Sequence, residues 1–484
     1  MYPSETSLIP VTVALTKFLE TNGLKAIFSN YPYWYLGSTP FRFLTGPIIP
    51  VFLSIFHKLL PNTSLFILTI YLIAFSFLLS AFGWTILWFQ VSSIKHQGGK
   101  TVLHTTFYIL LFLIFPWRLF ASLTLEEGSF TIARNLMPLA LLAIWSHFAK
   151  KDLKSKTWAV LAVSALLLIN TSVLPILLTG VAALALAFSF NDGKIRGLGK
   201  RIKSCFLILL ASLLLSTIYY FPTYWLSILA NPSIGGASGI KVVLRVLDLL
   251  KASAPLFLAI FAVCFSGKVK NRLSVFILTW TFTFLFLTIF RFIGDWDFWM
   301  DWTSWMYEIE IGIVLLIVNS KFSILNFKKH APYLTLLASL FLLPFYLTWR
   351  IYLALDRPPL ISNQVPRGVR SLDKLDEVVG SETTFLSGSS VFWANALYDI
   401  YQVRGGRDQV ATDPNWNKAA YEVREGKSPE KTKEWLNKLK VSFVMVHTPA
   451  SFEYYHDFKN LDKWEKIGKV IWQGNGDIIY KVYK

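Results

Sequence analysis

The 484-residue chain is 54% hydrophobic and 16% aromatic, and its formal net charge is +18. Such an apolar composition excludes an ordinary soluble protein and indicates a chain that crosses a membrane many times. The basic charge does not indicate a nucleic-acid partner, because five short loops hold 17 Lys/Arg against two acids, whereas residues 351–484 are nearly neutral, with 19 Lys/Arg and 17 Asp/Glu.

Residues 1–61 come before the first apolar segment that is long enough to span a bilayer. The apolar stretch Ile48–Leu60 lies between prolines and has only about 13 residues, fewer than the 17–25 that a span needs. We therefore expect it to lie in the membrane interface, with the aromatic run Tyr31–Tyr35 at headgroup level. Residues 1–61 are predicted to form a first outer loop with interfacial helices.

Residues 62–350 are predicted to form an α-helical membrane domain of about ten spans. Segment 64–94 is over-long, and splitting it into two spans would move residues 1–61 to the inner side. We divide residues 157–190 into two spans, and Asn170, Thr171 and Pro175 are the only signs of a turn between them. The expected spans are 64–94, 102–120, 131–149, 157–171, 173–190, 204–221, 253–267, 273–293, 306–319 and 332–350.

The loops between these spans alternate in charge. Short loops rich in Lys and Arg stay on the cytoplasmic side, so the loops that carry acids face outward. The basic loops are Lys95–Lys100, Lys150–Lys156, Asp192–Lys203, Lys268–Arg272 and Lys321–Lys329. This alternation places the end of the last span, and everything after it, on the outer side of the membrane.

After the last span the composition changes to that of a soluble domain. Prolines in 351–367 mark a linker, and residues 368–484 are predicted to form an extracytoplasmic α/β domain. Gly474-Asn475-Gly476 indicates a hairpin turn. The expected elements are helices at Leu372–Val379 and Pro429–Leu439, and strands at Thr383–Leu386, Val441–Val446, Val470–Gln473 and Asp477–Val482.

Acids in three outer segments are candidate site residues. A carboxylate in a half-buried, aromatic-lined pocket acts as a general base, and two acids together can hold a divalent cation. The alternative is that exposed loops carry acids for solubility. The candidates are Glu5, Glu126, Glu127, Asp295, Asp297 and Asp301, the last three among tryptophans.

Three arginines lie at or just inside the outer ends of the expected helices. Arg42, Arg134 and Arg291 present a fork of donors that suits the phosphate of a lipid carrier. The alternative is that each one reaches out to the lipid headgroups.

The layout resembles the GT-C superfamily of integral-membrane glycosyltransferases. Pro3–Thr6 resembles the acidic motif of the first outer loop in that superfamily, although Asp is commoner there than Glu5. Tyr33–Pro40 with Gly46–Pro50 resembles its aromatic-Gly-x-Pro stretch, and Ala121–Asn135 resembles its next outer loop. The superfamily has a transmembrane helix before the first motif. Either that helix belongs upstream of Met1, or Met1 is the true start and Glu5 is held only by the residues that follow it.

The tail is similar to a second membrane family, which is labelled as related to 6-pyruvoyl-tetrahydropterin synthase. The matching stretches are Leu386–Ser389, Val403–Gly406 and Trp435-Leu436 followed by Val441–Val446. Since these residues suggest no pterin chemistry, the label carries no function here.

The GT-C resemblance implies transfer of a hexose or pentose from a polyprenyl-phosphate donor to an extracytoplasmic glycan, lipid or protein acceptor. Glu5 would be the general base of an inverting displacement, and outer arginines would hold the donor phosphate. Glu126, Glu127 and an acid from 295–301 would orient the acceptor or hold a divalent cation. No other cofactor and no nucleic acid is implied.

Two other functions remain open. A transporter or lipid flippase would need charged or broken helices near the bilayer midplane. A non-catalytic anchor would only present residues 368–484 to a partner, and a missing first helix would fit it. A group of converging acids would count against the anchor.

Overall fold

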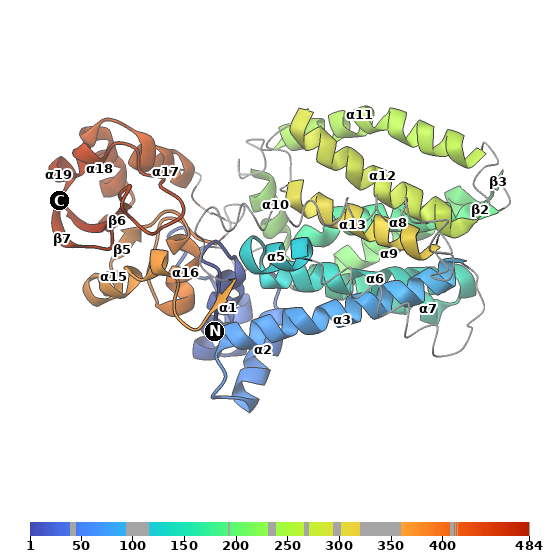
Figure 1. The fold of residues 1–484 in the computed structure, drawn as a ribbon, viewed down its shortest axis with the longest axis horizontal. Coiled ribbons are helices and arrows are strands. Elements are labelled where there is room, and N and C mark those ends of the chain that lie inside the picture. Colours follow the sequence, from blue (N-terminus) through green and yellow to red (C-terminus); the bar gives the residue numbers. More distant parts are fainter. Residues whose placement is uncertain are drawn as a thin grey trace, which may run out of the picture.

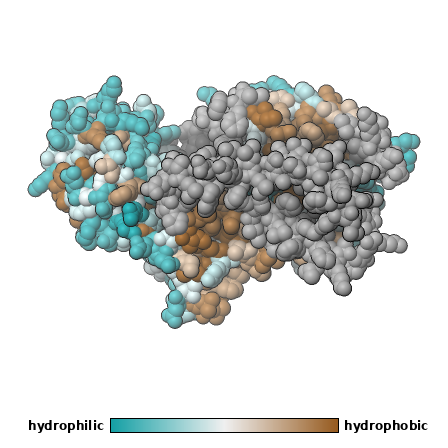
Figure 2. Space-filling model, viewed as in Figure 1, coloured by the Kyte–Doolittle hydropathy of each residue, from teal (hydrophilic) through white to brown (hydrophobic). Residues whose placement is uncertain are grey.

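The computed structural model describes residues 1–38, 45–92, 116–191, 194–230, 239–265, 271–293, 302–319, 360–406, 411, 413 and 415–483. Figure 1 shows a helical bundle beside a smaller domain of helices and strands, with the N-terminal segment between them. In Figure 2 hydrophilic residues cover most of the smaller domain, and hydrophobic residues gather on the coloured part of the bundle.

The bundle consists of helices that follow one another along the chain. Four segments within it are long and apolar enough to cross a membrane: Leu65–Val91, Gly128–Lys150, Thr171–Ser189 and Arg272–Ile289. Spans expected at 102–120 and 332–350 lie mostly or wholly outside the described residues, so the total of about ten stays a prediction. The helices are α3 (Leu65–Ser92), α5 (Pro116–Thr124), α6 (Gly128–Lys150), α7 (Leu153–Ile169), α8 (Leu174–Ser189), α9 (Leu198–Ser216), α10 (Pro222–Ala230), α11 (Ile240–Phe265), α12 (Arg272–Ile293) and α13 (Trp302–Asn319).

The over-long segment forms one continuous helix, α3. Its 28 residues are about 42 Å long, more than the roughly 30 Å hydrocarbon core. Gly83 allows α6 to approach closely, since a Cβ there would lie 3.0 Å from Pro138. Trp84 of α3 meets Trp280 of α12 edge to face, with ring centroids 5.2 Å apart. These contacts place α3 against the core of the bundle.

The segment between 157 and 190 contains two helices. Asn170 ends α7 in an extended conformation, and its side chain accepts a hydrogen bond from Ser172 N at 2.9 Å. A 3₁₀ turn, η2 (Thr171–Val173), then leads into α8, where Pro175 occupies the first turn. Because Pro lacks the amide hydrogen that a helix interior needs, it is tolerated at this start.

The basic loops that the structure describes lie together at one end of the bundle. Strands β2 (Phe190–Asn191) and β3 (Lys194–Ile195) form a small hairpin there. Arg272 donates to Phe190 O at 3.2 Å, and Arg201 and Arg272 both lie over the Phe188 ring. At the opposite end of α6 lie Glu126 and Glu127. For the described loops, this separation of basic and acidic ends is the one that the alternation predicts.

The C-terminal domain contains a four-stranded sheet in the order β5-β6-β8-β7. β5 (Thr383–Phe385) is parallel to β6 (Val441–His447), and the other pairs are antiparallel. β7 (Gly468–Gly474) and β8 (Asp477–Val482) form the predicted hairpin, with φ of 54° at Asn475 and 79° at Gly476. The helices are α15 (Leu372–Val379), α16 (Ser390–Leu397), α17 (Trp416–Glu425), α18 (Pro429–Lys438) and α19 (Trp464–Ile467). The sequence did not predict α16, α17 or α19.

The N-terminal segment, residues 1–38, packs into this domain from the far end of the sequence. β1 (Tyr2–Pro3) pairs with β4 (Ile361–Ser362). The buried Trp34 donates from Nε1 to Asn395 Oδ1 at 2.8 Å. A Cβ on Gly406 would lie 2.7 Å from the Trp34 ring. The folded C-terminal unit therefore includes an N-terminal part in addition to residues 368–484.

Two helices within residues 1–61 connect this unit to the bundle. α1 (Ile9–Asn22) is buried over most of its length. α2 (Ile48–Leu59) buries Ile49, Pro50, Leu53 and Ser54, while Phe52, Ile55, Phe56 and Leu59 remain exposed. Only α2 has the one-sided pattern that we expect of an interfacial helix.

We expect Gly406→Ala to destabilise the packing of the N-terminal segment. The new methyl group must displace the Trp34 ring, and such overpacking costs about 1–3 kcal/mol. Thermal unfolding of the detergent-solubilised protein measures the effect. Gly199→Ala is the control, because a Cβ on this exposed residue of α9 meets nothing within 4 Å. Equal unfolding temperatures for the two variants would contradict the packing described here.

Candidate active site

The turn between α5 and α6 carries two acids that face the protein interior. Glu126 is 5% exposed and Glu127 is fully buried. Acids that serve solubility remain in water, so that alternative does not account for this pair. Buried carboxylates near a membrane require partners, because an unpaired charge is costly there.

Glu127 joins three segments at this end of the bundle. Its Oε2 accepts a hydrogen bond from Thr45 Oγ1 at 3.0 Å and another from Asn170 Nδ2 at 2.9 Å. Ser129 lies within hydrogen-bond distance of both of these partners. Glu127 therefore connects the first turn of α6 to the α7–α8 turn and to the segment before α2.

Glu126 forms a buried ion pair with Arg134. The Nη1 of Arg134 donates to Glu126 Oε1 at 2.7 Å, and Thr131 Oγ1 donates to Oε2 at 2.8 Å. Arg134 is fully buried and its guanidinium lies 4.6 Å from the centroid of the Tyr307 ring. It therefore does not extend to the headgroups, which was the alternative for this residue.

A second arginine and a third acid, which sequence reasoning did not select, complete the group. Arg118 of α5 is fully buried and donates to Asn135 Oδ1 at 3.2 Å. Glu308 of α13 is also fully buried, and its Oε1 lies 3.8 Å from Arg134 Nε, too far for a hydrogen bond. Their signal in the sequence was a charge within a mostly apolar segment, and in α13 Glu308 is followed by a second acid, Glu310. We call Glu126, Arg134, Arg118 and Glu308 the buried ionic cluster.

The buried ionic cluster contains polar atoms without hydrogen-bond partners in the part of the chain that the structure describes. These are Nε and Nη1 of Arg118, Nε and Nη2 of Arg134, and both carboxylate oxygens of Glu308. Guanidinium donors bind phosphate oxygens, and carboxylates accept protons from hydroxyl groups. Buried polar atoms require partners, which water, an ion, other residues or a polar ligand can supply.

Glu5 lies at the contact between the N-terminal segment and the C-terminal domain. It is 7% exposed, and its Oε1 accepts a hydrogen bond from Tyr454 N at 2.7 Å. Its carboxylate lies directly against Gly368, where there is no room for a side chain. Its backbone oxygen accepts from Trp393 Nε1 at 2.8 Å.

The other candidate residues have no described side-chain position. Arg42, Asp295, Asp297 and Asp301 lie outside the described residues, and Arg291 lies in the last turn of α12, where only the backbone is described. Within the described ranges, no group of three or more His, Cys, Asp or Glu side chains is placed to hold a metal ion. The described residues by themselves therefore do not fit a metal site.

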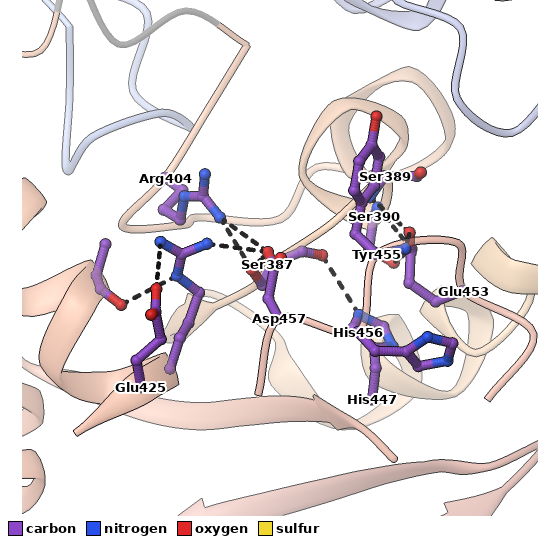
Figure 3. A network of polar contacts seen from close by, with 12 residues as sticks. Ser387, Ser389, Ser390, Arg404, Glu425, His447, Glu453, Tyr455, His456 and Asp457 are labelled. Atoms are coloured by element: carbon purple, nitrogen blue, oxygen red, sulfur yellow. Dashed lines mark hydrogen bonds and ion pairs between the residues drawn. The ribbon is translucent and has the colours of Figure 1, made fainter. Parts of the chain in front are cut away.

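A second polar network lies within the C-terminal domain (Figure 3). Asp457 accepts hydrogen bonds from Ser387 Oγ and from Arg424 Nη1, and Arg404 Nη1 lies 3.8 Å from it. Burial raises the pKa of Asp457, but these partners lower it by more than burial raises it. The pKa is therefore below its usual value. The carboxylate of Glu453 accepts from the backbone N–H groups of Ser389 and Ser390, and it thereby occupies the N-terminus of α16.

His447 is buried in this network, and both of its ring nitrogens have a partner. Its Nδ1 lies 2.8 Å from Asp477 Oδ1 and its Nε2 lies 3.3 Å from Ser387 O. A carboxylate and a carbonyl are both acceptors, so the protonated ring, which donates from both nitrogens, matches these two contacts. Burial lowers the pKa of His447, but the bond to Asp477 and the charge of Glu453 outweigh burial and raise it above the usual value. His447 contacts the carbonyl of Ser387 and not its hydroxyl, so this pair does not have the serine–histidine contact of a catalytic triad.

Comparison of the chain with known proteins gives matches to solved structures. No protein-family model matches the sequence, and no curated protein sequence is similar to it. The oligosaccharyltransferase of Archaeoglobus fulgidus, tethered to an acceptor peptide that contains the NVT sequon, matches with a TM-score of 0.53 and 12% identity, over 100% of this chain and 70% of that one. The same enzyme, AglB, with an inhibitory peptide and a dolichol phosphate, matches with a TM-score of 0.50 and 12% identity, over 98% and 70%.

A third structure of that archaeal enzyme, a complex with zinc and sulfate, matches with a TM-score of 0.50 and 13% identity, over 100% of this chain and 69% of that chain. At such low identity the likeness concerns the fold. It confirms the resemblance that the outer-loop motifs indicated. The chain has the fold of the archaeal oligosaccharyltransferase AglB.

Proposed function

We propose that this chain is an integral-membrane glycosyltransferase that moves a sugar from a polyprenyl-phosphate carrier to an acceptor. The observation that carries the proposal is the buried ionic cluster, with arginine donors that lack partners among the described residues, in a chain with the GT-C fold. The related archaeal structures contain a dolichol phosphate and an acceptor peptide, which supports a lipid carrier and a separate acceptor. The sugar is a hexose or pentose, and the acceptor is a glycan, a lipid or a protein.

In the proposed reaction the donor phosphate approaches the unpartnered donors of Arg118 and Arg134. An acceptor hydroxyl oxygen attacks the anomeric carbon, and the bond from that carbon to the phosphate oxygen breaks. The proton of the hydroxyl passes to the carboxylate of Glu5, and the electron pair of the broken bond remains on the lipid phosphate. The displacement inverts the anomeric carbon. The arginine charges stabilise the leaving phosphate as its negative charge develops.

The remaining candidates have supporting roles in this proposal. Glu126 holds Arg134 toward the donor, since their ion pair measures 2.7 Å. Glu127 fixes the turn that carries both acids. Asp295, Asp297 and Asp301 orient the acceptor or hold a divalent cation, and Arg42 and Arg291 add phosphate contacts. In this orientation the C-terminal domain lies outside the plasma membrane of a prokaryote, because the basic loops stay inside.

Two observations favour this proposal over its alternatives. Arg134 and Glu308 lie in the second turns of α6 and α13, which is near one end of the bundle, whereas a transporter or flippase needs its charged groups near the midplane. A non-catalytic anchor has no use for buried charges, because each of them costs several kcal/mol without a compensating role.

We expect Glu5→Gln to lower the rate of sugar transfer at least a hundredfold, to a small residual rate, without unfolding the protein. Glutamine retains an oxygen that accepts the hydrogen bond from Tyr454 N, but it does not take up a proton at neutral pH. Transfer of radiolabelled sugar from a polyprenyl-phosphate extract, together with the unfolding temperature, measures both properties. Glu434→Gln, an exposed change in the same domain, is the control. Retained transfer in Glu5→Gln would remove Glu5 from the mechanism.

We expect purified protein to retain polyprenyl phosphate, and Arg118→Met to reduce the bound amount at least tenfold. The guanidinium provides donors to the phosphate, whereas methionine keeps the apolar volume and provides none. Native mass spectrometry measures the bound lipid. Arg196→Met, an exposed change at the basic end, is the control. If the wild-type protein carries only bulk phospholipid even after polyprenyl phosphate is added, the proposed donor is wrong.

A further inference from the structure

A loop of the C-terminal domain contacts the candidate base from the far end of the chain. Residues 450–458, which follow β6, form this loop, and we call it the 450–458 loop. Its Tyr454 N–H donates to Glu5 Oε1 at 2.7 Å, although the two residues are 449 positions apart. The position of the Glu5 carboxylate therefore depends on the position of this loop.

Glu453 holds the loop directly beside Tyr454. This side chain is 1% exposed, and its Oε1 accepts from Ser389 N at 2.9 Å and from Tyr455 N at 3.2 Å. Its Oε2 accepts from both N and Oγ of Ser390 at 3.3 Å. The carboxylate thus joins the loop to the first turn of α16, where the helix dipole favours a negative charge.

The backbone before α16 is shaped to receive this carboxylate. Gly388 has φ of +66°, and a Cβ there would lie 2.7 Å from Glu453 Cδ. Only glycine adopts this conformation readily and leaves the required space.

Two more contacts anchor the ends of the loop. Ser451 Oγ donates to Asp477 Oδ1 at 2.6 Å, which ties the start of the loop to β8. Asp457 accepts from Arg424 Nη1 at 3.0 Å and from Ser387 Oγ, which ties its end to α17 and to the turn before α16 (Figure 3). With both ends and the middle held, the Tyr454 N–H has a defined position.

Two other elements of the domain enclose Glu5. Trp393 of α16 binds its backbone oxygen at 2.8 Å, and Gly368 of the 3₁₀ turn η4 (Arg367–Val369) lies against its carboxylate. From Glu5 the chain continues into α1, where Thr12 approaches the first residue of α6: a Cβ on Gly128 would lie 3.7 Å from Thr12 Oγ1. The same short segment therefore connects the C-terminal domain to the turn that carries Glu126 and Glu127.

We propose that the 450–458 loop positions Glu5 for proton transfer, with Glu453 as the positioning residue that holds the loop. The inference rests on the proposed function, in which Glu5 is the base. It assigns the C-terminal domain a part in the chemistry that is separate from any binding of acceptor. Catalysis depends on such placement, because a displacement of about 1 Å costs as much as a hundredfold in rate.

The test is a double-mutant cycle of Glu453→Gln and Glu5→Gln. Glutamine at 453 keeps the side-chain volume but directs an NH₂ group at one of the backbone N–H donors, so the loop loses part of its anchor. We expect Glu453→Gln alone to lower kcat at least tenfold and to leave KM for the lipid-linked sugar unchanged. In the Glu5→Gln background the same change is expected to have no further effect on the residual rate.

The outcomes of this cycle are distinct. Equal losses of rate in both backgrounds, or a rise in KM with unchanged kcat, would overturn the positioning role. A wild-type protein that transfers no sugar would instead refute the proposed function, and the inference with it. Glu434→Gln on the exposed side of α18 is the matched control and retains the wild-type rate.

A second variant covers the case in which Glu453→Gln does not fold, as judged by its unfolding temperature. Asp457→Asn loosens the other end of the loop at a more exposed site, where its side chain is 25% exposed. It can retain the one oxygen, Oδ2, that accepts from both Arg424 and Ser387, but it loses the negative charge that faces Arg424 and Arg404. We expect Asp457→Asn to lower kcat less than Glu453→Gln does. This loss is expected only when Glu5 is present and not in the Glu5→Gln background. A folded Asp457→Asn protein with wild-type kcat would contradict the proposal.

Discussion

The ion pair between Glu126 and Arg134 is the interaction on which the arrangement of this bundle depends. Two charges taken out of water cost several kcal/mol each, and only close contact together with further hydrogen bonds offsets that cost. Thr131 supplies one such bond, and the Tyr307 ring faces the guanidinium. α5, α6 and α13 are therefore constrained to keep their charged residues together, and this places arginine donors in an apolar interior.

The same end of the bundle is continuous with the C-terminal unit through the part of the chain that precedes α3. α1 lies between them, and Trp34 packs against Gly406 while Glu5 meets the 450–458 loop. A domain connected only through the linker would move freely. Here the N-terminal segment makes a second connection, so the position of the C-terminal unit and that of the candidate base are linked.

The relation to the archaeal oligosaccharyltransferase concerns architecture. At 12% identity few side chains are shared, yet the match extends over the whole of this chain. The fold therefore supplies the order of the helices and an end at which loops converge, whereas the chemistry must come from this chain's own charged residues. Arg118 and Glu308 are such residues, and the proposed function rests on them more than on the likeness.

Local patterns in the sequence were enough to predict several helices and one hairpin. Long apolar runs predicted α3, α6 and α12, and Gly474-Asn475-Gly476 predicted the hairpin of β7 and β8, because periodicity and turn chemistry act over a few residues. The sequence also selected Glu5, Glu126, Glu127 and Arg134 as charges that require an explanation.

The partners of the charged residues became apparent only in the folded chain. The contacts of Glu5 with Tyr454, of Arg134 with Glu308, and of Glu127 with Asn170 join residues from 43 to 449 positions apart. Such contacts are set by how helices and loops pack in space, and no local pattern encodes that packing. The same reason explains why the N-terminal segment could not be assigned to the C-terminal unit from the sequence.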